Sequence, residues 1–218
     1  MALNKLKFNS LNVTPSANEA IKFNSSANGF ETGSAGGSMK FIKKLTASSS
    51  STLSFVDGSS DVVLDNTYKE YIFIFNNLHT SASSTEFTFK ASTDSGSNYG
   101  ISTMTTSFMA EQGESDDTFL GYRSGNDAQN STGAIPISEN FGNDNDQSGS
   151  GYMHLFDPSS TTFTKHFIAQ MHSSHSLDYA DHCFVAGYIN TTSAVDAIQF
   201  AFGSGNIDSG TITLYGIN

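Results

Sequence analysis

Hydrophobic and polar residues alternate along much of this chain with the period of two that is typical of β-strands. In residues 85–91, Phe87, Phe89 and Ala91 share one face, while polar and charged residues occupy the other. Similar short apolar segments, separated by runs rich in Ser, Gly and Asn, predict further strands at residues 41–47, 52–56, 152–156, 163–169, 183–189, 197–202 and 211–217.

Residues 68–78 (YKEYIFIFNNL) form the most apolar segment, and they are apolar on both faces of a strand. A strand of this kind lies in the middle of a sheet and is covered on both sides, or its second face contacts another subunit. A homotrimer would supply such a cover symmetrically. We therefore expect the chain to self-associate, with a trimer as the predicted state.

The composition supports an all-β fold. Charged residues make up only 14% of the 218 residues, whereas Gly (19) and Phe (18) are plentiful. Long amphipathic helices need Leu, Ala, Glu, Lys and Arg instead. Because no repeat of fixed period is visible, a propeller or solenoid is not expected. About ten to twelve strands in a jelly-roll-like β-sandwich are predicted.

The first 38 residues differ from the rest and are predicted to form an extended N-terminal arm, followed by the sandwich in residues 39–218. The first 44 residues carry a net charge of about +4, so the remainder carries about −15 of the total −11. A mobile terminus is the alternative, but short apolar segments recur in the arm and favour docking onto a partner. The candidate anchoring residues are Lys5, Leu6, Phe8, Ile21 and Phe23.

Several classes of protein are not expected from this sequence. The acidic net charge argues against nucleic-acid binding. We expect neither a signal peptide nor membrane insertion, because no apolar segment has the required length. A single cysteine, Cys183, allows no intrachain disulfide, and its place in an apolar strand indicates a core residue. Synthesis in a cytoplasm is the expectation that follows.

No catalytic motif stands out. The chain contains no G-x-S-x-G elbow, H-E-x-x-H helix or phosphate-binding glycine loop. A pair of catalytic carboxylates, as in a glycosidase, is an alternative among the 21 Asp and Glu residues. Spacing in the sequence does not show which of these carboxylates lie close together in the fold. We expect a non-enzymatic protein, with a glycan depolymerase as the less favoured alternative.

Two acidic motifs predict turns. Residues 92–99 (STDSGSNY) resemble an Asp-box hairpin turn, in which Asp94 accepts backbone hydrogen bonds and Gly96 takes a positive φ. Asp144, Asp146 and Ser148 resemble the start of a calcium loop, but the position of its bidentate glutamate holds Leu155. A loop rich in Asx turns is therefore the alternative to a Ca²⁺ site, and no other cofactor is predicted.

Residues 111–150 and 170–182 are predicted to be loops. The first stretch is acidic and rich in Gly and Asn, and we place it at one end of the sandwich. Residues 170–181 show no strand pattern, so their histidines are expected to be exposed; a transition-metal site involving them is the alternative. The candidate contacts to a host surface in these stretches are Tyr122, Phe141, His172, His175 and Tyr179.

Three longer phrases carry a resemblance to a known group of proteins: GNDNDQSGSG at residues 142–151, HLFDPSSTTFTKHFIAQ at 154–170, and FVAGYINTTSAVDAIQFAFGSGNIDSGTITLYGIN at 184–218. They resemble small virion structural proteins of marine tailed bacteriophages. The arm phrases FNSLNVT and IKFNSSANGFE are similar to short virion-attachment segments in such proteins.

The resemblance implies a jelly-roll-like domain that is exposed on a virion, commonly as a trimer, and anchored to other virion proteins by its N-terminus. It implies no catalytic residues. Two locations follow from it: a short tail fibre or tail-tip adhesin that binds a host surface glycan, or a decoration protein on the capsid. Since the sequence has no coiled-coil or solenoid shaft, it favours decoration or a small fibre close to the particle.

Overall fold

The computed structural model of the chain describes residues 13, 14, 19–34 and 38–218. The chain forms two compact units, Met1–Ser38 and Met39–Asn218. Strands and no helices occur in the described residues, which confirms the predicted all-β class.

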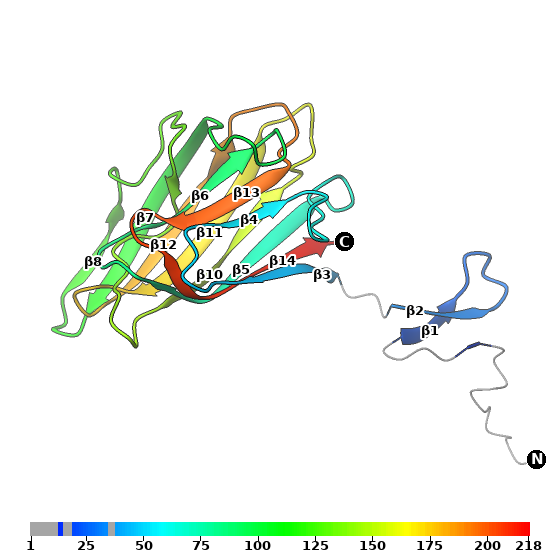
Figure 1. The fold of residues 1–218 in the computed structure, drawn as a ribbon, viewed down its shortest axis with the longest axis horizontal. Coiled ribbons are helices and arrows are strands. Elements are labelled where there is room, and N and C mark those ends of the chain that lie inside the picture. Colours follow the sequence, from blue (N-terminus) through cyan, green and yellow to red (C-terminus); the bar gives the residue numbers. More distant parts are fainter. Residues whose placement is uncertain (1–12, 15–18, 35–37) are drawn as a thin grey trace, which may run out of the picture. The chain divides into compact units, whose positions relative to one another are not determined.

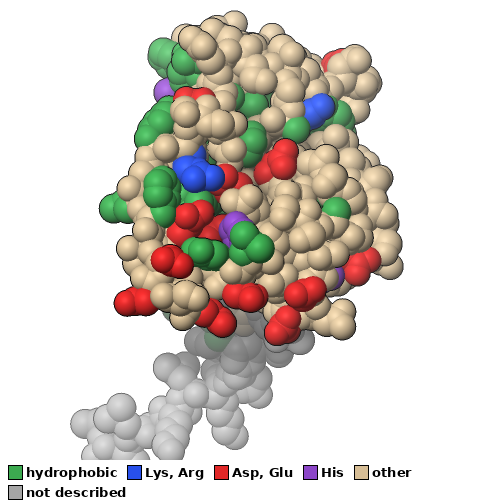
Figure 2. Space-filling model, turned by 90° about the vertical axis from the view of Figure 1, so that its left-hand side faces the viewer, with side chains coloured by type: hydrophobic (Ala, Val, Ile, Leu, Met, Phe, Trp, Pro, Cys, Tyr) green, Lys and Arg blue, Asp and Glu red, His purple; other side chains and the backbone are tan. Residues whose placement is uncertain are grey.

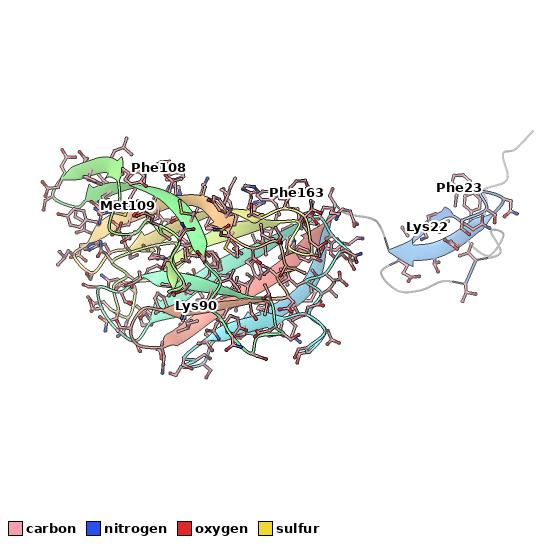
Figure 3. All side chains as sticks on the ribbon, turned by 90° about the horizontal axis from the view of Figure 1, so that it is seen from above. Lys22, Phe23, Lys90, Phe108, Met109 and Phe163 are labelled. Atoms are coloured by element: carbon pink, nitrogen blue, oxygen red, sulfur yellow. The ribbon has the colours of Figure 1, made fainter. Side chains whose placement is uncertain are left out.

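In the first unit, β1 (Glu19–Phe23) and β2 (Phe30–Ser34) form an antiparallel hairpin. Phe23 stacks on Phe30 with ring centroids 5.0 Å apart, and Lys22 forms an ion pair with Glu31 at 3.4 Å. Because neighbouring residues of a strand project to opposite sides, Lys22 and Phe23 lie on different faces of the hairpin (Figure 3). Residues 19–34 are thus a hairpin and not one extended segment. Lys5, Leu6 and Phe8 lie outside the described residues.

The second unit is a sandwich of two antiparallel sheets, which we name the wide sheet and the small sheet. The wide sheet has eight strands in the order β3-β14-β5-β10-β11-β12-β7-β8, and the small sheet has four in the order β4-β13-β6-β9. Figure 1 shows β4, β13 and β6 overlying the wide sheet. The bounds are β3 Met39–Thr46, β4 Leu53–Val56, β5 Glu70–Thr80, β6 Phe87–Ser92, β7 Thr103–Gly113, β8 Thr118–Tyr122, β9 Ile135–Pro136, β10 Gly149–Phe156, β11 Lys165–Ser174, β12 Tyr179–Ile189, β13 Ala197–Phe202 and β14 Ile207–Ile217.

Aromatic side chains fill the space between the sheets. Phe200 of β13 is fully buried, and its ring lies within 6.3 Å of four other rings. Edge-to-face and stacked rings of this kind combine a large buried apolar area with specific ring contacts. The partners of Phe200 come from both sheets: Phe55, Phe73, Phe75 and Phe87.

The doubly apolar segment predicted as a central strand is β5, which lies between β14 and β10. Its inward residues Tyr71, Phe73 and Phe75 are buried in the core. Its outward residues Ile72 and Ile74 are only half-buried, because no second layer of this unit covers the outer face of the wide sheet. One face of the strand is therefore covered within the chain, and the other is left to solvent or to a partner.

Residues 123–141 run along the edge of β7 and then pair with β6 of the small sheet through β9. The backbone N–H of Arg123 donates to the carbonyl of Ser107 at 2.9 Å, and the N–H of Ala128 donates to Thr105 Oγ1 at 2.7 Å. Phe141 is fully buried and packs against Phe202 at 5.0 Å. The prediction that Phe141 is an exposed contact is therefore wrong. Since β8, β9 and the end of β7 also lie within residues 111–150, this stretch is only partly loop.

The loop predicted for residues 170–181 is mostly strand. β11 continues to Ser174, β12 begins at Tyr179, and His172 lies opposite His182 with ring centroids 6.4 Å apart. Polar residues occupy both faces here, with Ser173 and Asp181 inside, so no alternation of hydrophobic and polar residues is visible in the sequence.

The predicted Asp-box turn is confirmed. Asp94 accepts hydrogen bonds from Ser92 Oγ at 2.7 Å, the Asn98 N–H at 2.9 Å and Asn98 Nδ2 at 2.6 Å. Gly96 has a φ of 76°, in the left-handed region that favours glycine. The hydrogen bonds, above all that from the Asn98 side chain, lower the pKa of Asp94.

Replacing Asp94 with alanine is expected to lower the Tm by a few degrees at pH 7, because three donors lose their acceptor. A depressed pKa contributes stability above the unfolded-state value of 3.8, and this contribution is lost as the pH falls. The Tm difference should therefore shrink below pH 4, as measured by thermal melts across pH. Asp117→Ala, at another exposed aspartate, is the matched control; an equal effect in both variants would contradict the prediction.

Candidate functional site

A polar cleft of about 480 Å³ opens at the end of the sandwich shown in Figure 2, where acidic side chains gather. Three segments meet there: the end of β7 with the turn that follows it, the loop before β10, and the bend between β11 and β12. The lining residues are Gln112, Gly113, Glu114, Asp144, Asp146, Gln147, His172, Ser174, His175, Asp178, Tyr179 and Ala180.

The cleft brings together residues that the sequence analysis placed in two unrelated sites. Asp144 and Asp146 belong to the predicted calcium loop, whereas His172, His175 and Tyr179 were predicted surface contacts. Ser148 instead lines a neighbouring polar hollow of about 410 Å³, which it shares with Asp146. Tyr122 and Phe141 line neither space.

Hydrogen bonds within the loop and to the neighbouring bend hold the calcium-like loop in place. The Gln147 N–H donates to the Asp144 carbonyl at 2.9 Å, and the Asp144 N–H donates to Gln147 Oε1 at 3.1 Å. Gln147 Nε2 also donates to the His175 carbonyl at 3.2 Å, which ties the loop to the bend. Within the described part of the chain, no three or more His, Cys, Asp or Glu side chains are placed to hold a metal ion. The Ca²⁺ site stays a prediction.

His175 contributes a neutral hydrogen-bond acceptor to the local structure. Its Nδ1 accepts from the Leu177 N–H at 2.8 Å, and Tyr179 packs edge-on against the ring at 5.3 Å. Burial lowers the pKa of His175, and this effect outweighs the opposing influence of Glu111 and Glu139. The cleft therefore combines an aromatic ring, carboxylates and amides, which are groups that can bind the hydroxyls of a glycan.

A buried carboxylate lies on the inner face of the wide sheet near this end. Asp181 is fully buried, and neither of its carboxylate oxygens has a hydrogen-bond partner among the described residues. It lies in register with Ser173 on β11 and Glu111 on β7. Burial raises the pKa of Asp181 to about 7, with smaller contributions from Glu111 and Glu139 and an opposing one from Arg123.

The residues around Asp181 offset its charge only in part. Arg123 Nη2 donates to Glu139 Oε2 at 2.5 Å, so this nearby cation is already paired. Glu139 Oε1 and Ser173 Oγ, like Asp181, lack partners among the residues described. An ionised carboxylate without donors is costly in such a place, and Asp181 is therefore held largely protonated below neutral pH. This burial is not predictable from the polar residues around Asp181, which indicate an exposed loop and not the inner face of a sheet.

The outer face of the wide sheet forms a second candidate site. We define it by fifteen outward side chains of β7, β10, β11 and β12: Met104, Thr106, Phe108, Ala110, Tyr152, His154, Phe156, His166, Ile168, Gln170, His172, His182, Phe184, Ala186 and Tyr188. None of the fifteen is Lys, Arg, Asp or Glu, but the carboxylate of Glu70 on the neighbouring strand β5 contacts His154 Nδ1. Phe108, labelled in Figure 3, is 45% exposed, and Ile168 is also 45% exposed.

Tyr122 borders this surface on the edge strand β8 and does not line the cleft. It lies on β8 opposite Phe108, and its hydroxyl donates to Asp127 Oδ2 at 2.7 Å. This hydrogen bond raises the pKa of Tyr122. A period-two pattern shows which residues of one strand share a face, but not which strands lie side by side. The strands that form this surface are separated in sequence, so the pattern alone does not predict it.

Cys183 is buried, and burial raises the pKa of its thiol to about 12, as expected for a core residue and not for a nucleophile.

Among the residues that the structure describes, there is no helix with the length and hydropathy required to cross a membrane. Comparisons of the chain with protein-family models, curated proteins and solved structures find no match.

Proposed function

We propose that this chain is a non-enzymatic structural component of a tailed-phage virion, a short fibre or decoration protein anchored by its N-terminal segment. Its body would be a jelly-roll-like sandwich exposed on the particle, commonly as a homotrimer. The sequence phrases given above support the virion assignment. The observation that carries the anchoring role is the isolated hairpin of β1 and β2.

In the described residues the two hairpin strands pair only with each other. A two-stranded hairpin of this kind is at best marginally stable in water. Phe23 and Phe30 are nonetheless 67% and 43% exposed, which favours a surface that packs against a partner. The unpaired outer edges of both strands can also accept a strand from another protein.

Deleting residues 1–38, or combining Phe23→Ser with Phe30→Ser in the full chain, is expected to remove the protein from purified virions. The body should keep its Tm, because its core lies within residues 39–218. Incorporation is measured by mass spectrometry of virions assembled with each variant. Lys22→Ser combined with Glu31→Ser is the matched control, since it changes the opposite face of the hairpin. Normal incorporation of the deletion variant would refute the anchoring role.

The copy number of the protein distinguishes a position on the capsid from a position on the tail. Mass spectrometry of intact virions and of isolated capsids should find a decoration protein on the capsid in hundreds of copies. A few copies confined to the tail would instead favour a tail fibre.

A host-glycan adhesin is the second candidate function, and the polar cleft beside Tyr179 favours it. If the cleft binds a glycan, the chain should bind members of a glycan array, and Tyr179→Ala should abolish that binding. Phe163→Ala is the control, because Phe163 is 70% exposed and lies outside the cleft. Release of reducing sugar from a bound glycan would overturn the non-enzymatic assignment.

A further inference from the structure

We infer that Asp181, Glu139 and Ser173 form a buried binding site for a hard divalent cation, with Ca²⁺ as the expected occupant. The site lies on the inner face of the wide sheet and is distinct from the calcium-like loop at Asp144 and Asp146. The inference goes beyond the proposed virion role, because it concerns a ligand held inside the body of the protein.

Four buried side-chain oxygen atoms carry the inference: both carboxylate oxygens of Asp181, Oε1 of Glu139 and Oγ of Ser173. Within the part of the chain that the structure describes, these four are the buried side-chain polar atoms without a hydrogen-bond partner. Asp181 and Ser173 are fully buried, and Glu139 is nearly so. Buried polar atoms are almost always paired, so the concentration of unpaired oxygens on three residues indicates a ligand that pairs with them.

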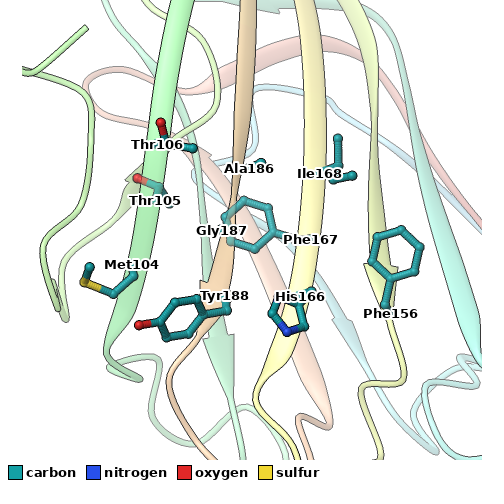
Figure 4. A pocket seen from close by; sticks show the side chains of 10 residues that line it. All are labelled: Met104, Thr105, Thr106, Phe156, His166, Phe167, Ile168, Ala186, Gly187 and Tyr188. Atoms are coloured by element: carbon teal, nitrogen blue, oxygen red, sulfur yellow. The ribbon is translucent and has the colours of Figure 1, made fainter. Parts of the chain in front are cut away.

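The strand register brings two of these residues together. Ser173 on β11 lies opposite Asp181 on β12, and Glu111 on β7 lies opposite Asp181 on the other side. β11, β12 and β7 are neighbours in the wide sheet, and Figure 4 shows another stretch of these three strands side by side. Residues in register project to the same face, with Cβ atoms about 4.5–5.5 Å apart. One ion can therefore contact oxygen atoms of both Asp181 and Ser173.

Glu139 reaches the same place from the segment that precedes β10. The Gly142 N–H donates to the carbonyl of Ser174 at 3.0 Å, so this segment runs along the end of β11. Burial raises the pKa of the Cys183 thiol, and Glu139 also influences it, which places Glu139 near this thiol. Cys183 lies two residues from Asp181 and thus on the same face of β12. The unpartnered Oε1 of Glu139 is therefore available to an ion bound at Asp181.

The charges around the site favour a cation over a water molecule. Asp181 interacts electrostatically with Glu111 and Glu139, and Arg123 opposes these two carboxylates. Three carboxylates and one guanidinium leave a formal charge of −2 when all four groups are ionised. A water molecule can donate hydrogen bonds but brings no charge. A divalent cation instead neutralises the excess charge and displaces the proton that Asp181 otherwise retains.

The donor atoms select a hard cation. All four are oxygen atoms, which suit Ca²⁺ or Mg²⁺ and not the softer transition metals. Mg²⁺ usually keeps several water molecules, whereas Ca²⁺ accepts irregular sets of protein oxygens and bidentate carboxylates. A buried site therefore fits Ca²⁺ better. Glu111 contributes charge and is not counted as a ligand, in agreement with the absence of three or more acidic, His or Cys ligands at one point among the described residues.

Thermal melts and isothermal titration calorimetry of the full-length chain at pH 7.5 test the inference, after EDTA treatment and dialysis into cation-free buffer. The wild type is expected to bind Ca²⁺. Its Tm should rise by roughly 5–10 °C at a Ca²⁺ concentration 100-fold above Kd. The gain arises because the ion binds only the folded chain, in which it joins Glu139 to β11 and β12.

Asp181→Asn and Ser173→Ala each remove one proposed ligand. Without Ca²⁺ the Asp181→Asn chain is expected to be at least as stable as the wild type, so its loss of response to Ca²⁺ is separate from a failure to fold. It should lose most of the Tm gain, because the negative charge is gone. Ser173→Ala should weaken binding about tenfold. Asp117→Asn, at an exposed aspartate, is the matched control and should respond like the wild type.

Combining Asp144→Asn with Asp146→Asn separates this site from the calcium-like loop. If that double variant loses the response to Ca²⁺ while Asp181→Asn keeps it, the ion binds in the loop and the inference is wrong. A wild type that neither binds Ca²⁺ nor gains Tm would also overturn it, as would equal responses of the wild type and Asp181→Asn.

Discussion

Replacing Phe200 with alanine is expected to destabilise the sandwich by about 3–5 kcal/mol, the usual cost of truncating a fully buried phenylalanine. Phe200 touches rings from both sheets, so its loss leaves a cavity between the layers and removes four ring contacts. A domain of this size has a total stability of about 5–15 kcal/mol, and the Tm should fall by roughly 10 °C. Urea unfolding followed by circular dichroism measures the change.

Phe200→Leu should cost less than half as much, because leucine fills most of the same volume. Phe163→Ala, at a 70% exposed aromatic residue, should leave the free energy of unfolding nearly unchanged. If Phe200→Ala and Phe163→Ala gave similar values, the aromatic cluster around Phe200 would not be the centre of the core.

Replacing Asp181 with asparagine is expected to stabilise the protein at pH 8 and to have much less effect at pH 4. The wild-type carboxyl has a pKa of about 7 in the folded protein and its ordinary pKa of 3.8 in the unfolded chain. At pH 8 the wild type must hold an ionised carboxylate without donors beside Glu111 and Glu139, whereas the asparagine is neutral at every pH.

The sign of the change in the free energy of unfolding with pH follows from the number of protons that Asp181 binds in the folded and unfolded chain. Between about pH 4 and pH 7 the folded wild type binds more protons at Asp181 than the unfolded chain does, so the free energy of unfolding falls as the pH rises. The slope from one such group is at most about 1.4 kcal/mol per pH unit. Other carboxylates also titrate in this range, so the informative quantity is the difference between wild type and variant.

Thermal melts of both proteins from pH 4 to pH 8 measure this difference. Asp178→Asn is the matched control, because Asp178 is an exposed aspartate three residues away and should show no such pH-dependent gain. A difference between Asp181→Asn and wild type that does not change with pH would show that Asp181 is not held protonated.

Local features of this protein were predictable from the sequence. The alternation of Phe87, Phe89 and Ala91 predicted β6, and those three residues are buried as expected. The turn around Asp94 was also predictable, because its hydrogen bonds join residues at most four positions apart. Such features depend on the pleat of a strand and on the chemistry of neighbouring side chains, which the sequence states directly.

The candidate sites were less predictable. His172, His175 and Tyr179 were proposed as surface residues, and Asp144 and Asp146 as metal ligands, but nothing in the sequence indicated that one cleft would hold all five. Phe141 was assigned to the surface because it stands among polar residues, and only its packing against Phe202 shows it to be core. These positions depend on contacts between segments far apart in the chain.

The sequence by itself determined the class of the fold, most of its strands and one of its turns, since period-two patterns and turn hydrogen bonds are local. The tertiary structure decided which strands are neighbours, and with that it decided the burial of Asp181, the polar cleft and the aromatic side chains that share the outer face. The reason is that strand order and register pair residues that are distant in sequence, and a shift of one residue would move every side chain of a strand to the opposite face.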